Sequence, residues 1–152
     1  MQDTALDNPE NLDDNTKKGN QGEMRTDQYL REHGYERISL DGVTSHDQQG
    51  HHGIDGVYYN KNGHPQYLIV EAKYGSGKLG ETTDGKQMSQ QWIENRLDEA
   101  VGKEKADEIR KEMQNNLANV RSAVSFVNKE GNVTLKPLDK DGNIIKNATC
   151  FD

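Results

Sequence analysis

The clearest structural pattern in this chain is the stretch IDGVYYNKNGHPQYLIVEAK, residues 54–73. β-Branched and aromatic residues alternate with other residues on both sides of a polar segment, 60–65, which carries the Asn, Gly and Pro residues typical of turns. This pattern predicts two antiparallel strands joined by a tight turn. We expect the rest of the chain to be organised around this hairpin.

Three polar side chains of the hairpin are predicted to share one face. A turn centred on Gly63 places Asp55 opposite Glu71, since each lies eight positions from Gly63. Cβ atoms of opposed residues lie roughly 5 Å apart, which is close enough for both carboxylates to bind one divalent cation. Because side chains alternate between the faces of a strand, Lys73 shares the face of Glu71, and Ala72 points the other way.

Two carboxylates and a lysine in this arrangement suit the hydrolysis of a phosphodiester. Mg²⁺ or Mn²⁺ held by carboxylates neutralises the charge that develops on the phosphate and generates hydroxide near neutral pH. In this hypothesis Asp55 and Glu71 hold the metal ion, and Lys73 helps to deprotonate the attacking water or stabilises charge on the phosphate. The alternative interpretation is that Glu71 and Lys73 form a charged pair on a half-exposed strand.

The composition indicates one domain with a small hydrophobic core, preceded by a polar leader. Of the 152 residues, 30% are hydrophobic, and the mean hydropathy is -1.10. Residues 1–18 contain five acids and two bases, and we expect them to form a disordered leader before a domain over residues 19–152. The formal net charge of -7 does not indicate nucleic-acid binding, so such a function requires a local basic patch.

The sequence also excludes several kinds of site and location. Cys150 is the one cysteine, which excludes an intramolecular disulfide and a zinc site made of cysteines alone. No apolar run approaches the length of a membrane span, and the N-terminus lacks the apolar core of a signal peptide. We therefore expect no stable membrane insertion by this domain, and its passage across a membrane would depend on something outside this chain.

Periodicity and turn residues predict the remaining elements. Apolar residues at helical spacing, including Trp92 as a core residue, indicate helices, and Glu23 in the first turn of its helix is explained by the helix dipole alone. The resulting order of elements predicts an α+β or mixed α/β fold. The predicted elements are a helix over 19–34, a strand over 35–40, helices over 86–101 and 103–120, and strands over 122–128 and 132–138.

Two loops supply candidate contacts to nucleic acid. The polar loop 43–53 is rich in histidine, but its spacing matches no zinc motif. We expect these histidines to contact a phosphate or to have no role in binding, with zinc binding as an alternative. The Gly-rich loop 74–84 lacks the spacing of a P-loop and is partly basic. The candidate contacts are Lys78, His46, His51 and His52 in these loops, together with Lys86 at the start of the helix that follows.

The arrangement of acids resembles the PD-(D/E)XK nuclease superfamily. Asp55 follows Gly-Ile, a hydrophobic strand ends in VEAK, and Glu23 lies on an upstream helix. The resemblance implies a restriction-endonuclease-like central β-sheet flanked by helices, with Asp55, Glu71 and Lys73 as the catalytic core. It further implies that Glu23 is an additional metal ligand and that Gln87, on the next helix, takes part in the site.

Segments within residues 53–97 resemble one group of nucleases in particular. GIDGVYY, EAKYGSGKLG and DGKQMSQQWIENRL are similar to the nuclease domains at the C-termini of bacterial polymorphic toxins, of which contact-dependent inhibition proteins are the best known. The resemblance implies a toxin delivered as part of a larger surface protein, which acts in the cytoplasm of a target bacterium. It also implies a cognate immunity protein in the producer and Mg²⁺ or Mn²⁺ as cofactor, with Zn²⁺ as an alternative.

The sequence leaves the substrate and the class of protein open. Toxin nucleases of this kind include DNases and tRNases. DNA is favoured because a few phosphate contacts can hold a duplex without base reading, and the sequence has no aromatic-rich strand for stacking RNA bases. Alternatives from other classes are an acidic protein-binding module of the immunity type and a catalytically silent nucleic-acid-binding module. Metal-dependent cleavage would distinguish the enzyme from both.

Overall fold

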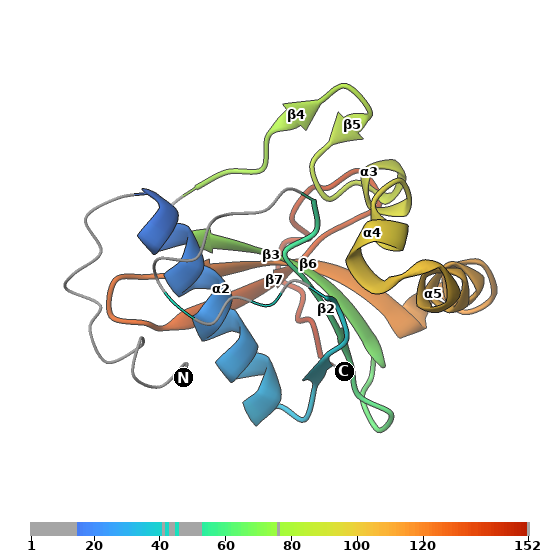
Figure 1. The fold of residues 1–152 in the computed structure, drawn as a ribbon, viewed down its shortest axis with the longest axis horizontal. Helices are drawn as coiled ribbons and strands as arrows, with labels where there is room; N and C mark the ends of the chain where they lie inside the picture. The colour runs from blue at the N-terminus through green and yellow to red at the C-terminus, as the bar shows by residue number, and fades with distance from the viewer. Residues whose placement is uncertain (1–14, 41, 43–44, 46–52, 76, 152) are drawn as a thin grey trace.

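A computed structural model describes residues 15–40, 42, 45, 53–75 and 77–151. It has a central five-stranded sheet of order β1-β2-β3-β6-β7, flanked by helices (Figure 1). The predicted α+β class is confirmed, and the architecture is consistent with a restriction-endonuclease-like fold. The elements are α2 (Asn15–Glu32), β1 (Glu36–Arg37), β2 (Gly56–Tyr59), β3 (Tyr67–Tyr74), β4 (Glu81–Thr82), β5 (Gly85–Lys86), α3 (Gln90–Glu94), α4 (Leu97–Val101), α5 (Lys103–Asn115), the 3₁₀ turn η2 (Leu117–Asn119), β6 (Val120–Val127) and β7 (Val133–Pro137).

The hairpin of β2 and β3 forms in the predicted register. The two strands pair antiparallel, with Gly56 opposite Val70. This pairing centres the connection on Gly63. Continued by one residue, it places Asp55, immediately before β2, opposite Glu71. The alternation of side chains therefore puts both acids on the same face of the sheet.

Side-chain alternation along β3 separates the interior into two cores. On one face, Ile69 belongs to a core that includes Trp92 of α3 and Ile109 of α5. On the other face, Leu68 belongs to a core that includes Leu30 of α2. Removing an aliphatic side chain of this size from water stabilises the fold by about 1.5–3 kcal/mol. The two cores hold α2 and the group α3–α5 on opposite faces of the sheet (Figure 1).

The central strand β3 is paired along its whole length with β6. The two strands run parallel, from Tyr67 opposite Val120 to Tyr74 opposite Val127. Parallel neighbours need a crossover connection, and α3, α4 and α5 provide it. β7 then returns antiparallel to β6 at the edge of the sheet. The half of β3 that carries Glu71 and Lys73 is therefore held by β6, while β2 pairs with the first half of the strand.

The first helix differs from the prediction at both ends. It was predicted over 19–34, but α2 spans Asn15–Glu32. Gly19 and Gly22 lower the helix propensity of this segment, and packing overrides it: a Cβ at Gly22 would lie 3.7 Å from the backbone nitrogen of Tyr74 on β3. The start of α2 therefore falls within the predicted leader 1–18. Residues 1–14 lie outside the described residues, and their disorder stays a prediction.

The helix predicted over 86–101 is interrupted. β5 ends at Lys86, a loop follows, and the helical residues are divided between α3 and α4. Gly85 and Met88 have positive φ values of 110° and 71°, which an α-helix cannot accommodate. The hydroxyl of Ser89 then caps α3 by accepting from the backbone N–H of Trp92 at 3.4 Å. Gln87 consequently lies in a loop and not on a helix, which corrects the prediction for its position.

Smaller differences affect the other predicted elements. The helix predicted over 103–120 ends at Asn115, because Asn116 has a non-helical φ of -153°. The strand predicted over 35–40 is reduced to the two residues of β1. Strands β6 and β7 confirm the hairpin predicted near the C-terminus. Among the described residues, no helix is both long and apolar enough to cross a membrane.

Candidate active site

The two acids of the hairpin are held at adjacent positions by hydrogen bonds. Asp55 is half-buried, and its Oδ2 accepts from the backbone N–H of Ala72 at 2.9 Å. Glu71 is 5% exposed, and its Oε2 accepts from Nε2 of Gln87 at 2.8 Å. The sheet therefore brings together Asp55 and Glu71, and the loop before α3 adds Gln87 to them.

The other carboxylate oxygen of Glu71 lacks a protein donor. Oε1 is buried and has no hydrogen-bond partner in the described part of the chain. Burial raises the pKa of Glu71 well above its usual range, and the negative charge of Asp55 raises it further, whereas Lys73 lowers it. A buried carboxylate oxygen without a donor, next to a second carboxylate, is the environment that a bound cation stabilises.

The donor set fits a hard divalent cation. Mg²⁺ is commonly bound through one or two carboxylates while it keeps several of its waters. Asp55 and Glu71 supply two such carboxylates on one face of the sheet. Among the residues that the structure describes, no group of three or more His, Cys, Asp and Glu side chains is placed to hold a metal ion.

Lys73 lies on the same face as Glu71, as predicted. Its Nζ is 3.7 Å from Oε2 of Glu71, and its side chain is 24% exposed. The glycine-rich loop after β3 passes over its stem, since a Cβ at Gly77 would lie 3.3 Å from Cδ of Lys73. The ammonium group is thus close to the acids and still reachable by a substrate.

Glu23 is placed differently from its prediction. No acid lies in the first turn of α2, and Glu23 is a buried residue in the middle of the helix, so the helix-dipole explanation is wrong. α2 covers the face of β3 that Ala72 points toward, opposite to the carboxylate of Glu71. The charge of Glu23 nevertheless contributes to the raised pKa of Glu71. Glu23 therefore influences the site electrostatically from α2.

A buried polar network next to Asp55 was not predicted. Arg37 donates from Nη2 to Oδ1 of Asp27 at 2.9 Å and from Nη1 to the backbone oxygen of Asp55 at 3.0 Å. The hydroxyl of Tyr58 also donates to Asp27. The sequence signal was an arginine in a segment predicted as a strand, which requires an acidic partner if it is buried. That partner is on α2, ten positions earlier.

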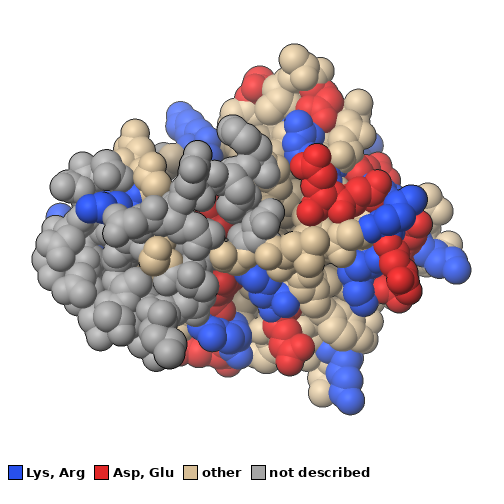
Figure 2. Space-filling model, in the orientation of Figure 1, with Lys and Arg blue, Asp and Glu red and all other residues tan. Residues whose placement is uncertain are grey.

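The basic residues predicted to contact nucleic acid differ in their exposure to solvent. Lys78 is exposed in the loop after β3. Lys86 is half-buried, and its Nζ donates to Oδ1 of Asn143 at 2.8 Å. The three loop histidines, His46, His51 and His52, lie outside the described residues. On the described part of the face in Figure 2, basic and acidic side chains are interspersed.

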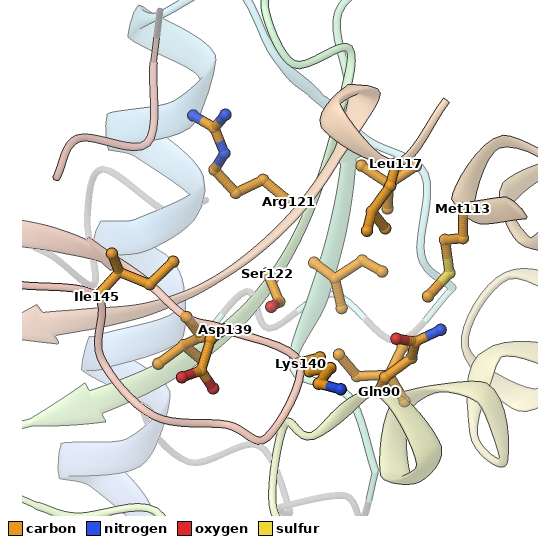
Figure 3. Close-up of a pocket in the computed structure, with 12 residues that line it drawn as sticks. Gln90, Met113, Leu117, Arg121, Ser122, Asp139, Lys140 and Ile145 are labelled. Atoms are coloured by element: carbon orange, nitrogen blue, oxygen red, sulfur yellow. The ribbon is translucent and has the colours of Figure 1, made fainter. Parts of the chain in front are cut away.

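A separate apolar pocket lies away from these residues. It has a volume of about 250 Å³ and lies between the start of β6, α5 and the segment after β7. Its lining includes Ile69, Met113, Leu117 and Ile145, together with polar groups at its rim (Figure 3). None of the predicted site residues contributes to it, so the candidate active site is not this pocket.

Comparison with known proteins identifies the family. A family model described as nuclease-related domain (NERD) matches residues 18–144, a range that contains all the residues gathered around Glu71. No curated protein and no solved structure matches the chain significantly. The match supports a nuclease enzyme with nucleic acid as its substrate. By the extent of this match, the chain belongs to the nuclease-related domain family.

Proposed function

We propose that this chain is a divalent-metal-dependent endonuclease whose site consists of Asp55, Glu71 and Lys73. The observation that carries the proposal is the buried Oε1 of Glu71, which has no hydrogen-bond partner in the described part of the chain and lies beside the second carboxylate. A protein retains such a costly arrangement where a ligand supplies the missing charge. Family membership makes a phosphodiester the expected substrate.

Each residue would have a distinct task. Asp55 and Glu71 would bind Mg²⁺ or Mn²⁺, with Zn²⁺ as an alternative, and this cation would supply Lewis-acid stabilisation of the phosphate. Lys73, 3.7 Å from Glu71, would hold a phosphate oxygen or take the proton of the attacking water. Gln87 would keep the carboxylate of Glu71 in one orientation through its 2.8 Å hydrogen bond.

Glu23 would support the site as an auxiliary acid. It lies on α2, beside the strand that carries Glu71 and Lys73, and its charge acts on Glu71. We propose Glu23 as an auxiliary metal ligand with a weaker role than the two acids of the hairpin, because α2 covers the face of β3 opposite to the carboxylate of Glu71. Glu23→Ala should therefore reduce activity less than Asp55→Ala does.

The biological role follows from the resemblance of residues 53–97 to polymorphic-toxin nucleases. We propose that this domain is delivered as the toxic part of a larger surface protein and cleaves nucleic acid in the cytoplasm of a target bacterium. DNA is the favoured substrate and tRNA the alternative. An immunity protein with basic residues at its interface would block the site in the producer, since the domain is acidic overall.

One cleavage assay tests the enzymatic proposal. The purified chain is incubated with supercoiled plasmid or total tRNA in the presence of Mg²⁺, Mn²⁺, Zn²⁺ or EDTA. We expect nicking of the plasmid with Mg²⁺ or Mn²⁺ and none with EDTA. Asp55→Asn and Glu71→Gln should abolish cleavage, while Glu99→Gln, an exposed substitution on α4, should not.

The same assay separates the alternatives. Cleavage of tRNA under conditions in which the plasmid survives would make RNA the substrate and retain the nuclease. Cleavage that persists in EDTA would contradict the metal requirement. Binding of nucleic acid without cleavage under every condition would instead favour a silent binding module.

A further inference from the structure

Gln87 links the acid Glu71 to the loop after β3. Its Nε2 donates to Oε2 of Glu71 at 2.8 Å, and its Oε1 accepts from the backbone N–H of Gly80 at 3.4 Å. Its own backbone N–H donates to the oxygen of Gly80 at 2.8 Å. Both ends of the side-chain amide are therefore occupied, and a shift of the backbone at residue 87 would break the contact with Glu71.

The backbone next to Gln87 is in an unusual conformation. Met88 has φ 71°, in the left-handed region that residues with a side chain rarely adopt. Its side chain is fully buried in the core with Trp92 and Ile93. The conformation lets neighbouring residues point in different directions, Met88 into the core and Gln87 toward Glu71. Such a conformation persists only where surrounding structure holds it in place.

The loop of residues 139–143, which follows β7, provides that surrounding structure. Gly142 has φ 80°, and a Cβ there would lie 2.9 Å from the backbone oxygen of Gln87 and 3.2 Å from the backbone nitrogen of Ser89. The backbone N–H of Gln90 donates to the oxygen of Lys140 at 2.8 Å. Figure 3 shows Lys140 beside Gln90 at the edge of the apolar pocket.

The loop has a defined shape of its own. Oδ1 of Asp139 accepts from the backbone N–H groups of Asp141 at 2.9 Å and Asn143 at 3.0 Å. The side chain of Asn143 in turn accepts from Nζ of Lys86 at 2.8 Å. The loop thus contacts the chain immediately before and immediately after Gln87, in addition to lying against Gln87 itself.

We infer that the loop 139–143 positions Gln87 on Glu71, with Gly142 as the residue that permits the close approach. This inference rests on the proposed nuclease function of the site. It makes Gly142 and Asp139 positioning residues, which act through Gln87 and touch no reacting group. The active site would then depend on a segment that follows the last strand of the sheet.

The test compares variants of the full chain. Gly142→Ala should displace the backbone of Gln87 and lower kcat by about 10- to 100-fold, with little change in KM. Gln87→Ala should give a similar loss, and Gly142→Ala combined with Gln87→Ala should be no slower than Gln87→Ala alone. Gly34→Ala is the matched control: Gly34 also has a left-handed φ, 87°, but its added Cβ would meet only the side chain of Asn60.

A second pair of variants covers the case in which Gly142→Ala does not fold. Asp139→Ala removes the acceptor that shapes the loop, and Asp139→Asn keeps an oxygen at the same position. We expect Asp139→Ala to lower kcat and Asp139→Asn to restore it. Folding of each variant is checked by circular dichroism and by its melting temperature.

The outcomes separate this inference from the proposed function. A folded Gly142→Ala variant with the kcat of the wild type, or losses that multiply in the double variant, would overturn the positioning role. If the wild type cleaves no nucleic acid, the proposed function fails, and the side-chain amide signal of Gln87 in an ¹H–¹⁵N NMR spectrum tests the positioning directly. That signal should shift in Gly142→Ala and stay in place in Gly34→Ala, and an unchanged signal in both would refute the inference.

Discussion

Arg37 donates a hydrogen bond from Nη1 to the backbone oxygen of Asp55, at 3.0 Å. The same guanidinium donates from Nε and Nη2 to the carboxylate of Asp27 on α2. Asp55 is thereby held at its backbone by Arg37 and at its side chain by the N–H of Ala72. Arg37 of β1 thus connects α2 with Asp55, which lies immediately before β2. The position of Asp55 therefore depends on contacts with α2, β1 and β3.

Replacing Arg37 should destabilise the fold. Arg37→Met removes the cationic partner of Asp27, whose side chain is only 8% exposed, and the loss of one member of a buried ion pair costs about 3–5 kcal/mol. We expect a decrease of about 3 kcal/mol in the free energy of unfolding, measured by urea denaturation. Lys105→Met is the control, because the pair of Lys105 with Glu108 is exposed and worth less than about 1 kcal/mol. Equal losses in both variants would contradict the structural role of Arg37.

Glu71 should make the metal-free protein less stable as the pH rises. Burial raises the folded-state pKa of Glu71 well above its ordinary value of about 4.5, so its contribution to stability is fully present below about pH 4.5 and is lost as the pH rises through the folded pKa. Glu71→Gln removes this titration. In EDTA at neutral pH we therefore expect a higher melting temperature for Glu71→Gln than for the wild type.

Metal addition provides the complementary measurement for Glu71. A cation that binds only the folded state raises the melting temperature by mass action. Addition of Mn²⁺ should therefore stabilise the wild type and the exposed control Glu99→Gln, but not Glu71→Gln. A rise of equal size in all three proteins would place the cation elsewhere.

Lys73 should be required for chemistry and not for folding. Lys73→Ala should lower kcat by about 100-fold or more, because general acid–base groups typically contribute that much. Its far-ultraviolet circular dichroism spectrum should remain that of the wild type, since the side chain is 24% exposed. Lys61→Ala, in the exposed turn of the same hairpin, is the matched control and should keep full activity. Loss of the folded spectrum together with activity would assign Lys73 a structural role.

Lys78 and Lys86 should contribute to binding through phosphate contacts. Each contact on duplex DNA adds about 0.9 to the slope of log affinity against log salt concentration. Replacing both lysines by glutamine should reduce that slope by about two contacts, measured by fluorescence anisotropy of a labelled duplex in EDTA. Lys61→Gln should leave the slope unchanged. An unaltered slope in the double variant would exclude both lysines from the DNA interface.

The hairpin could be predicted because its information is local. Alternation of side chains and the turn residues around Gly63 are visible in a stretch of twenty residues, and they predicted both the strands and the register that brings Asp55 next to Glu71. The face shared by Glu71 and Lys73 followed from the same alternation. A local pattern was sufficient wherever the contact it described was also local.

The rest of the site depends on contacts between distant segments. Gln87 was predicted on a helix because the following residues have helical periodicity, but the turn at Met88 lies against Gly142, far along the chain. Glu23 was assigned to a first turn because the packing of Gly22 against β3 leaves no local pattern in the sequence, and α2 already includes Asn15. The ion pair of Asp27 with Arg37 likewise became visible only once α2 lay across the sheet.

The parallel pairing of β3 with β6 has a consequence for biosynthesis. Tyr67 and Val120 pair across more than fifty intervening positions, so the chain must close a long loop before β3 gains its second neighbour. While the ribosome is still translating the crossover helices, Asp55 and Glu71 have already been synthesised. At this stage β3 has no neighbour on the side that β6 will occupy. A nascent or truncated chain that ends before Val120 therefore contains Asp55, Glu71 and Lys73 without a finished sheet to hold them. On the proposed function, cleavage of nucleic acid would therefore begin only after the residues of β6 have been translated.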